Sequence, residues 1–235
     1  GSQFARRQLV SELGVAPERA EVVYNGVTEA CRSLPRDEKL AARLGVADRR
    51  GLFYLGSLKP RKNLQVLLEA FRLVLRERKH AHGVHLLLAG RGESEPALRQ
   101  QTLQLGLEGA VSFAGFVPEE EKVAWYNLAD IFVFPSRLEG FGLVAAEAMA
   151  CAKPVVASRA GALPEVVADG ETGILCDPDD PADFARAIVG LLESPCVAAK
   201  MGKAGLARVA RLFQWDESAR RTLAIYEEAV RQRRK

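Results

Sequence analysis

From Gly51 onward the chain alternates short apolar segments with longer amphipathic ones. The short segments are too apolar to leave one side facing water: LFYLGS, VHLLLAG, VSFAGFV, IFVFPS, PVVAS and GILC. Strands that are apolar on both sides are typical of a parallel sheet covered by helices on both faces. The alternation therefore predicts an α/β chain with a Rossmann-like, doubly wound parallel sheet and helices on both faces.

The first 50 residues do not follow this alternation. Residues 4–14 (FARRQLVSELG) predict a charged helix, residues 20–27 (AEVVYNGV) resemble a strand with an Asn-Gly turn signal, and Arg36 to Leu44 predict a polar helix. The chain begins with GSQF rather than Met, which is typical of an expression scar joined to part of a longer protein. We expect this region to be a hinge or the edge of a neighbouring domain.

After Pro195 the pattern is wholly helical. In the last segment Leu223, Tyr226 and Val230 recur at helical spacing. This predicts a helical C-terminal tail that is docked by one face.

Charge and hydropathy exclude several classes of protein. The 235 residues include 33 Lys and Arg interleaved with 30 Asp and Glu, so the net charge of +3 gives little support for a polyanionic partner. The apolar runs are far shorter than the ~20 residues that a membrane-spanning helix requires. We expect no nucleic-acid partner and a cytoplasmic location.

The residue types that most often bind metals lack the spacing of a metal site. The cysteines are expected to be reduced, buried thiols: Cys31, Cys151, Cys176 and Cys196. The histidines crowd one link between a helix and a strand and are expected on the surface: His80, His82 and His85.

In a doubly wound sheet, ligands bind outside the carboxyl ends of the strands, so the loops that follow the strands carry the chemistry. The first such loop contains Lys59, Arg61 and Lys62 just before a helix that starts near Asn63. Cations beside a helix amino end favour a diphosphate site over a merely solvated turn.

Two further loops are candidates for ligand contact. Gly90 and Gly92 follow the second strand, but no third glycine completes a dinucleotide fingerprint, so we interpret them as a close backbone turn. Phe113 to Val117 ends the next strand and offers an apolar wall to a nucleobase.

The stretch RLEGFGLVAAEA carries the most informative carboxylates. Gly140 and Gly142 allow an anion to approach the amino end of a helix, with Glu139 at the rim of that turn. Glu147 lies on an apolar helix face, where a bare carboxylate costs several kcal/mol unless it has a partner. Ribose hydroxyls and a neighbouring protein group are equally good partners on this reasoning.

Two more acidic segments follow. Pro164 is expected to open a short helix that Asp169-Gly170 ends, with Glu165 either as a partner of the helix amino end or as a ligand contact. The run DPDD, Asp177 to Asp180, predicts a helix cap rather than a metal motif.

Taken together, these motifs resemble the carboxyl-terminal domain of the family 4 (group 1) retaining glycosyltransferases of GT-B fold. The segments that carry the resemblance are VVYNGV, LGSLKPRKN, LLLAGRG, VSFAGFV, WYNLADIFVFPSRLEGFGLVAAEAMA, KPVVASRAGALPEVV and GETGILCDPDD. Such proteins have two Rossmann-like domains, of which the first holds the acceptor and the second the nucleotide-sugar donor.

The resemblance implies roles for particular residues. Glu139 would lie near the donor sugar and Glu147 on the ribose hydroxyls, while Lys62, assisted by Arg61, would neutralise the diphosphate. Many members have arginine where this chain has Ser57. The remaining donor contacts would be Ser57, Gly90, Val117, Gly140, Phe141, Gly142, Leu143 and Val144.

The resemblance also implies a domain organisation. Residues 1–25 would be the scar, the edge of a missing acceptor domain and the linker. Residues 26–213 would bind the donor, and the helix of residues 214–235 would pack back on the missing domain.

The activity that this implies is sugar transfer from a UDP- or GDP-sugar to an acceptor glycan or lipid, without cofactor or metal. We expect the full-length protein in the cytoplasm, with peripheral association with the inner face of the membrane as the alternative. A sugar-nucleotide epimerase of the same fold and a non-catalytic nucleotide-binding module remain alternatives. A glycosidase is a third, but it would leave the basic loop and the glycine turn unexplained.

Overall fold

The structure, a computed structural model, describes residues 1–77 and 83–233. Its centre is a six-stranded sheet in the order β3-β2-β1-β4-β5-β6, and every neighbouring pair of strands is parallel. The strands are β1 (Arg50–Leu55), β2 (Val84–Ala89), β3 (Val111–Gly115), β4 (Ile131–Phe134), β5 (Val155–Ser158) and β6 (Gly173–Cys176). The strand order reverses between β1 and β4, as in doubly wound folds, so the predicted architecture is confirmed.

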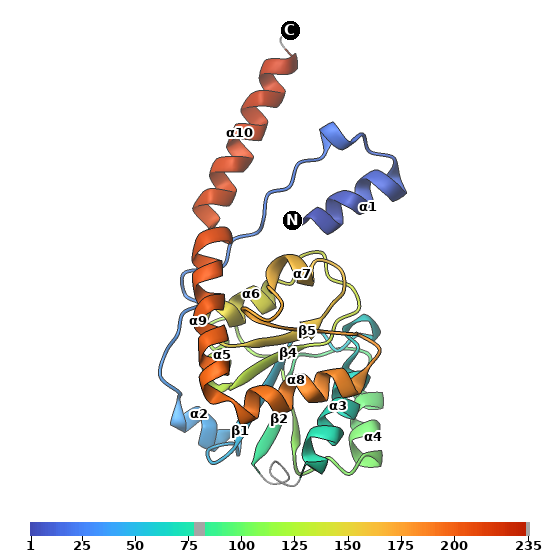
Figure 1. The fold of residues 1–235 in the computed structure, drawn as a ribbon, viewed down its shortest axis with the longest axis vertical. Helices are drawn as coiled ribbons and strands as arrows, with labels where there is room; N and C mark the ends of the chain where they lie inside the picture. Colours follow the sequence, from blue (N-terminus) through green and yellow to red (C-terminus); the bar gives the residue numbers. More distant parts are fainter. Residues whose placement is uncertain (78–82, 234–235) are drawn as a thin grey trace.

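Helices cover both faces of this sheet (Figure 1). On one face α3 packs against α4 and α8, and on the other α6 packs against α9. The helices of the sheet region are α3 (Leu64–Arg76), α4 (Glu95–Gln104), α5 (Lys122–Leu128), α6 (Leu143–Ala150), α7 (Leu163–Val166), α8 (Pro181–Glu193) and α9 (Pro195–Leu212). The remaining helical elements are α1 (Gln3–Leu13), α2 (Glu38–Arg43), α10 (Trp215–Arg233) and the 3₁₀ turns η1 (Pro17–Arg19) and η2 (Pro60–Lys62).

An aromatic cluster fixes α5 against the centre of the sheet. The ring of Phe53 on β1 lies 5.6 Å from that of Tyr126 and 5.9 Å from those of Trp125 and Phe132, measured between centroids. Such offset or edge-to-face pairs stabilise a core by about 0.5–1.5 kcal/mol each beyond the burial of their area. This packing places the polar side of α5 beside α6, which matters for the site.

Residues 20–27 do not form the expected strand. Val27 makes one isolated bridge to Gln214, and its amide donates to the carbonyl of Phe213. The edge strands of the sheet are β3 and β6, and this segment reaches neither of them but runs past the junction of α9 and α10. Its β-branched residues therefore pack without a strand partner.

The helix α10 projects away from the sheet (Figure 1). Its apolar positions Leu223, Tyr226 and Val230 are 59%, 67% and 50% exposed, so the expectation that this helix is docked by that face is wrong within the described chain. Packing on a further domain stays a prediction. Among the described residues, no helix combines the length and the apolarity needed to cross a membrane.

Several smaller expectations need correction. His85 is buried, not on the surface, because it is an inner residue of β2, whereas His80 and His82 lie outside the described residues. Cys31, Cys151 and Cys176 are buried free thiols as expected, but Cys196 is exposed because it lies in the first turn of α9. The helix α7 begins at Leu163, with Pro164 in its first turn, and ends at Val166, before Asp169-Gly170.

Candidate functional site

A cavity of about 420 Å³ opens at the carboxyl ends of the first three strands. It contains four residues that the sequence assigns to donor binding: Ser57, Gly90, Val117 and Val144. The other residues that line it are Leu55, Gly56, Arg91, Phe116, Glu119 and Lys122. The cavity therefore lies where ligands bind in doubly wound sheets.

Gly90 shapes the floor of this cavity. Its φ angle is +132°, and a Cβ atom there would lie 1.8 Å from the carbonyl oxygen of Gly56. The loops after β1 and β2 thus touch through their backbones, and only glycine fits at the contact. This agrees with the sequence-based interpretation of Gly90 as a close backbone turn.

Glu147 has two protein partners on α5. Its carboxylate accepts a hydrogen bond on Oε1 from the Lys122 ammonium at 3.0 Å and on Oε2 from the Tyr126 hydroxyl at 2.7 Å. Lys122 and Tyr126 are four residues apart, so they lie on one side of α5. The protein partner that burial requires is therefore present, and contact of Glu147 with a ribose stays a prediction.

The protonation of both partners suits this arrangement. Burial, reinforced by the charge of Glu147, raises the pKa of the Tyr126 hydroxyl well above its ordinary value, so Tyr126 remains a donor. Burial alone would lower the pKa of Lys122, but the charges of Glu147 and Glu119 outweigh it and raise that pKa. Lys122 therefore remains a cation.

Glu139, Lys62 and Arg61 form a second cluster. The Lys62 ammonium is ion-paired with Oε1 of Glu139, and Nη1 of Arg61 lies 4.0 Å from the same oxygen. Lys62 also lies over the Phe134 ring, 4.9 Å from its centroid. Glu139 was expected at the rim of the turn, but it is buried, because Lys62 holds its carboxylate inward.

The amino end of α6 lies between Glu139 and Glu147 in the sequence and offers free amides. Gly142 has a φ angle of +96° and gives the helix no side-chain cap, and a Cβ there would lie 2.7 Å from the side chain of Leu163. Without a cap, the amides of Leu143 and Val144 remain suited to an anion.

The neighbouring residues Gly140 and Phe141 contact residues outside the sheet. The Phe141 ring packs against Phe213, with centroids 5.3 Å apart, so only its backbone can face a ligand. The Gly140 carbonyl accepts a hydrogen bond from the Ser2 hydroxyl at 2.6 Å. The glycine turn is thus anchored from outside the sheet.

Glu165 binds a helix amino end, but not that of its own helix. Its carboxylate accepts the amides of Gln3 and Phe4 at 2.7 and 2.6 Å, the first turn of α1, and the Tyr24 hydroxyl at 3.2 Å. Asp180 caps α8 as the sequence predicts, accepting the amide of Ala182 at 2.8 Å.

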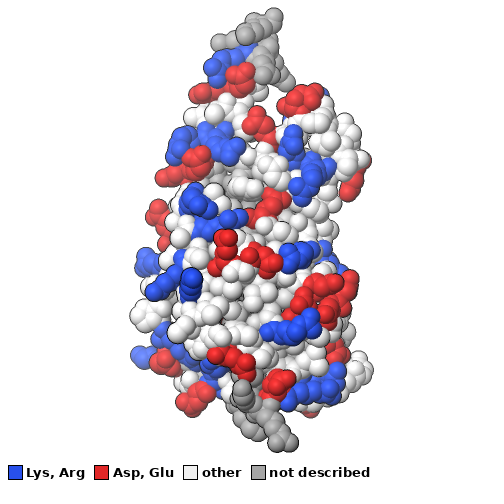
Figure 2. Space-filling view, in the orientation of Figure 1, with Lys and Arg blue, Asp and Glu red and all other residues white. Residues whose placement is uncertain are grey.

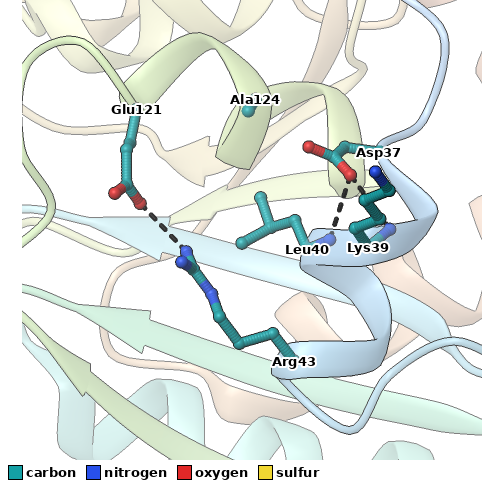
Figure 3. A pocket seen from close by; sticks show the side chains of 6 residues that line it. All are labelled: Asp37, Lys39, Leu40, Arg43, Glu121 and Ala124. Atoms are coloured by element: carbon teal, nitrogen blue, oxygen red, sulfur yellow. Dashed lines mark hydrogen bonds and ion pairs between the residues drawn. The ribbon is translucent and has the colours of Figure 1, made fainter.

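A smaller cavity of about 260 Å³ lies between α2 and α5 (Figure 3). Its Arg43 and Glu121 form an ion pair at 3.1 Å, and its Asp37 caps α2. These charges are used to join the two helices. We therefore assign this cavity a structural role.

Surface charge does not mark another site on the face that Figure 2 shows, where basic and acidic side chains alternate. Within residues 1–77 and 83–233, no three His, Cys, Asp or Glu side chains gather in a way that could hold a metal ion.

Residues 35–208 match the sequence profile of the family described as glycosyl transferases group 1. The chain belongs to this family. A D-inositol 3-phosphate glycosyltransferase of Thermomonospora curvata is 37% identical over 235 residues, which cover 94% of this chain and 54% of the relative. The chain thus spans about half the length of the curated relatives that it matches.

Solved structures agree with this family assignment and with the GT-B fold. HepE from Anabaena in complex with UDP-glucose superposes with a TM-score of 0.88 at 27% identity, covering 97% of this chain and 62% of HepE. The C-terminal domain of LpcC, a group 1 family protein of Francisella tularensis, gives a TM-score of 0.72 at 26% identity, covering 80% of this chain and 98% of that domain.

Sequence reasoning missed part of the candidate site. Lys122 and Tyr126 come from a helix more than 20 residues before Glu147, and their spacing of four residues is the one signal that could have paired them. Phe116, which is largely exposed at the cavity, directly precedes the predicted Val117.

Proposed function

We propose that this chain is the donor-binding domain of a retaining, metal-independent glycosyltransferase. The donor is a UDP- or GDP-sugar, and the acceptor is a sugar or lipid-linked glycan held by a part of the protein outside this chain. The observation that carries the proposal is the cavity at the strand ends. Lys122 lines this cavity and forms an ion pair with Glu147. The likeness to HepE, solved with UDP-glucose, supports a nucleotide-sugar donor.

In this proposal the donor lies along the strand-end loops. The base occupies the cavity against Val117, and the ribose hydroxyls donate to Glu147. The diphosphate meets Lys62, Arg61 and the free amides of α6, and the sugar lies near Glu139. This order uses an apolar pocket for the base and cations for the phosphates.

The chemistry follows from charge. Breaking the bond between the anomeric carbon and the phosphate oxygen leaves a nucleoside diphosphate whose negative charge grows in the transition state. Fixed cations and amides accelerate the step when they stabilise the charge of the transition state more strongly than the charge of the bound donor. Lys62, Arg61 and the α6 amides would supply that stabilisation, so we expect no requirement for a divalent cation.

Calorimetry tests the proposal with UDP, GDP, ADP and their sugars, each with EDTA and with Mg²⁺. We expect one base to bind with similar affinity in both buffers. The variant Glu147→Ala should weaken binding at least tenfold, whereas Glu108→Ala, an exposed glutamate at the opposite ends of the strands, should not. Absence of binding by every nucleotide would favour a non-catalytic interaction module.

A second assay separates transferase from epimerase. Because the acceptor part lies outside this chain in the proposal, we expect the 235 residues to bind donor without efficient transfer. Conversion of the bound sugar nucleotide to its epimer, followed by NMR, would instead support the epimerase alternative. Robust transfer by this chain alone would contradict the proposed division of labour.

A further inference from the structure

Lys122 is placed to act on Glu147 rather than on solvent. It is the first residue of α5, its side chain is 16% exposed, and it lines the cavity at the strand ends. Its ammonium contacts Glu147 at 3.0 Å and Glu119 at 3.1 Å. Because Glu119 is an exposed residue and Glu147 a buried one, the inner contact is the less screened of the two.

The surroundings of Glu147 contain little else that could balance its charge. The residue is 4% exposed, and the groups that face it are Lys122 and Tyr126 on α5, the Cys31 thiol of the N-terminal segment and the Cys151 thiol at the end of α6. Within the described part of the chain, Lys122 is the one cation within 4.0 Å of this carboxylate. A buried carboxylate without such a partner is strongly disfavoured.

The two hydrogen bonds still leave Glu147 able to accept more. Each carboxylate oxygen has two lone pairs, and the structure uses one on Oε1 for Lys122 and one on Oε2 for Tyr126. One acceptor position per oxygen remains for a pair of neighbouring hydroxyls. The partners also fix the rotation of the carboxylate, because they hold both oxygens from the same helix.

We propose that Lys122 is a positioning residue that holds Glu147 as a charged acceptor for the two ribose hydroxyls of the donor. Lys122 acts through Glu147 and does not bind the phosphates. This inference rests on the proposed function. It adds that ribose recognition depends on a pair formed between α5 and α6 before the donor arrives.

Calorimetry with UDP and 2′,3′-dideoxy-UDP tests this role, or with GDP and its analogue if the panel selects guanine. The variant Lys122→Met should weaken the nucleotide with ribose hydroxyls about tenfold and leave the dideoxy analogue within about twofold. Lys122→Arg should restore most of the affinity, and Lys200→Met, which changes an exposed lysine on α9, should change neither ligand. Unchanged binding of the analogue also shows that the variant is folded.

A double variant shows whether Lys122 acts through Glu147 or contacts the nucleotide directly. In Glu147→Gln the carboxylate is already absent, so adding Lys122→Met should cause no further loss. Equal weakening of both ligands by Lys122→Met would indicate phosphate contact and overturn the inference, as would unchanged affinity for both. If the unmodified chain binds no nucleotide, the proposed function fails and this inference fails with it.

Discussion

The ion pair between Lys62 and Glu139 should contribute strongly to the stability of the free protein. Both side chains are largely buried, 9% and 11% exposed, and removing one partner of a buried pair typically costs about 3–5 kcal/mol. The variant Glu139→Gln removes the charge but keeps an oxygen that can accept from Lys62. We therefore expect a loss of about 2–3 kcal/mol, at or just below the lower end of that range.

The structure also predicts an asymmetry between the two partners. In Lys62→Met, Glu139 keeps Arg61 as a neighbour, 4.0 Å away, so its charge remains partly balanced. In Glu139→Gln, Lys62 instead loses its carboxylate and stays near the positive Arg61. We expect Lys62→Met to cost about half as much, and the double variant to be less destabilised than the sum of both.

Thermal unfolding followed by circular dichroism measures these effects. At about 2–4 °C per kcal/mol for a domain of this size, Glu139→Gln should lower Tm by about 5–10 °C. The control is Glu95→Gln, which breaks an exposed pair with Arg99 and should lower Tm by less than about 2 °C. A shift as small as this in Glu139→Gln would show that the pair is screened by solvent and refute the reasoning.

Other predictions concern groups outside the donor cavity. Burial and the nearby charge of Arg49 lower the pKa of His85 to about 4. As the pH falls, the unfolded chain therefore protonates this histidine at a higher pH than the folded chain does. The free energy of unfolding then falls by up to about 3 kcal/mol as the pH falls from about 6.5 towards 4. In His85→Gln the urea midpoint of unfolding should depend less on pH over that range. Glu165→Ala should speed exchange of the α1 amides of Gln3 and Phe4 about fivefold, measured by NMR, while the sheet stays protected. Asp180→Ala removes the α8 cap and should lower Tm by about 2–4 °C, and no change in Tm would show that the cap is dispensable.

The sheet could be predicted from sequence because its signal is local. Each strand is a short apolar run. In a chain that alternates such runs with amphipathic helices, the runs indicate the strands of a parallel sheet buried on both faces. Residues 20–27 have the same β-branched composition but pair with none of the six strands of the sheet. Strand formation depends on a partner as well as on the segment, and the sequence of the segment does not contain that information.

The site could be predicted only in part, for a related reason. The burial of Glu147 follows from its apolar helix face, but its partners come from α5, which aromatic packing places beside α6. The burial of Glu139 likewise depends on Lys62, 77 residues earlier in the chain. Sequence reasoning identified which charges need partners. The fold decides which partners they obtain.

The two lysine–glutamate pairs explain how the proposed site for a dianionic ligand can contain two buried carboxylates. In the free protein each carboxylate is held by a lysine, Glu139 by Lys62 and Glu147 by Lys122, so neither charge is left unbalanced. In the proposed complex the pairs differ. The diphosphate would compete with Glu139 for Lys62, whereas the ribose would add to Glu147 without displacing Lys122. The first pair would therefore rearrange when the donor binds, and the second would act as a fixed support.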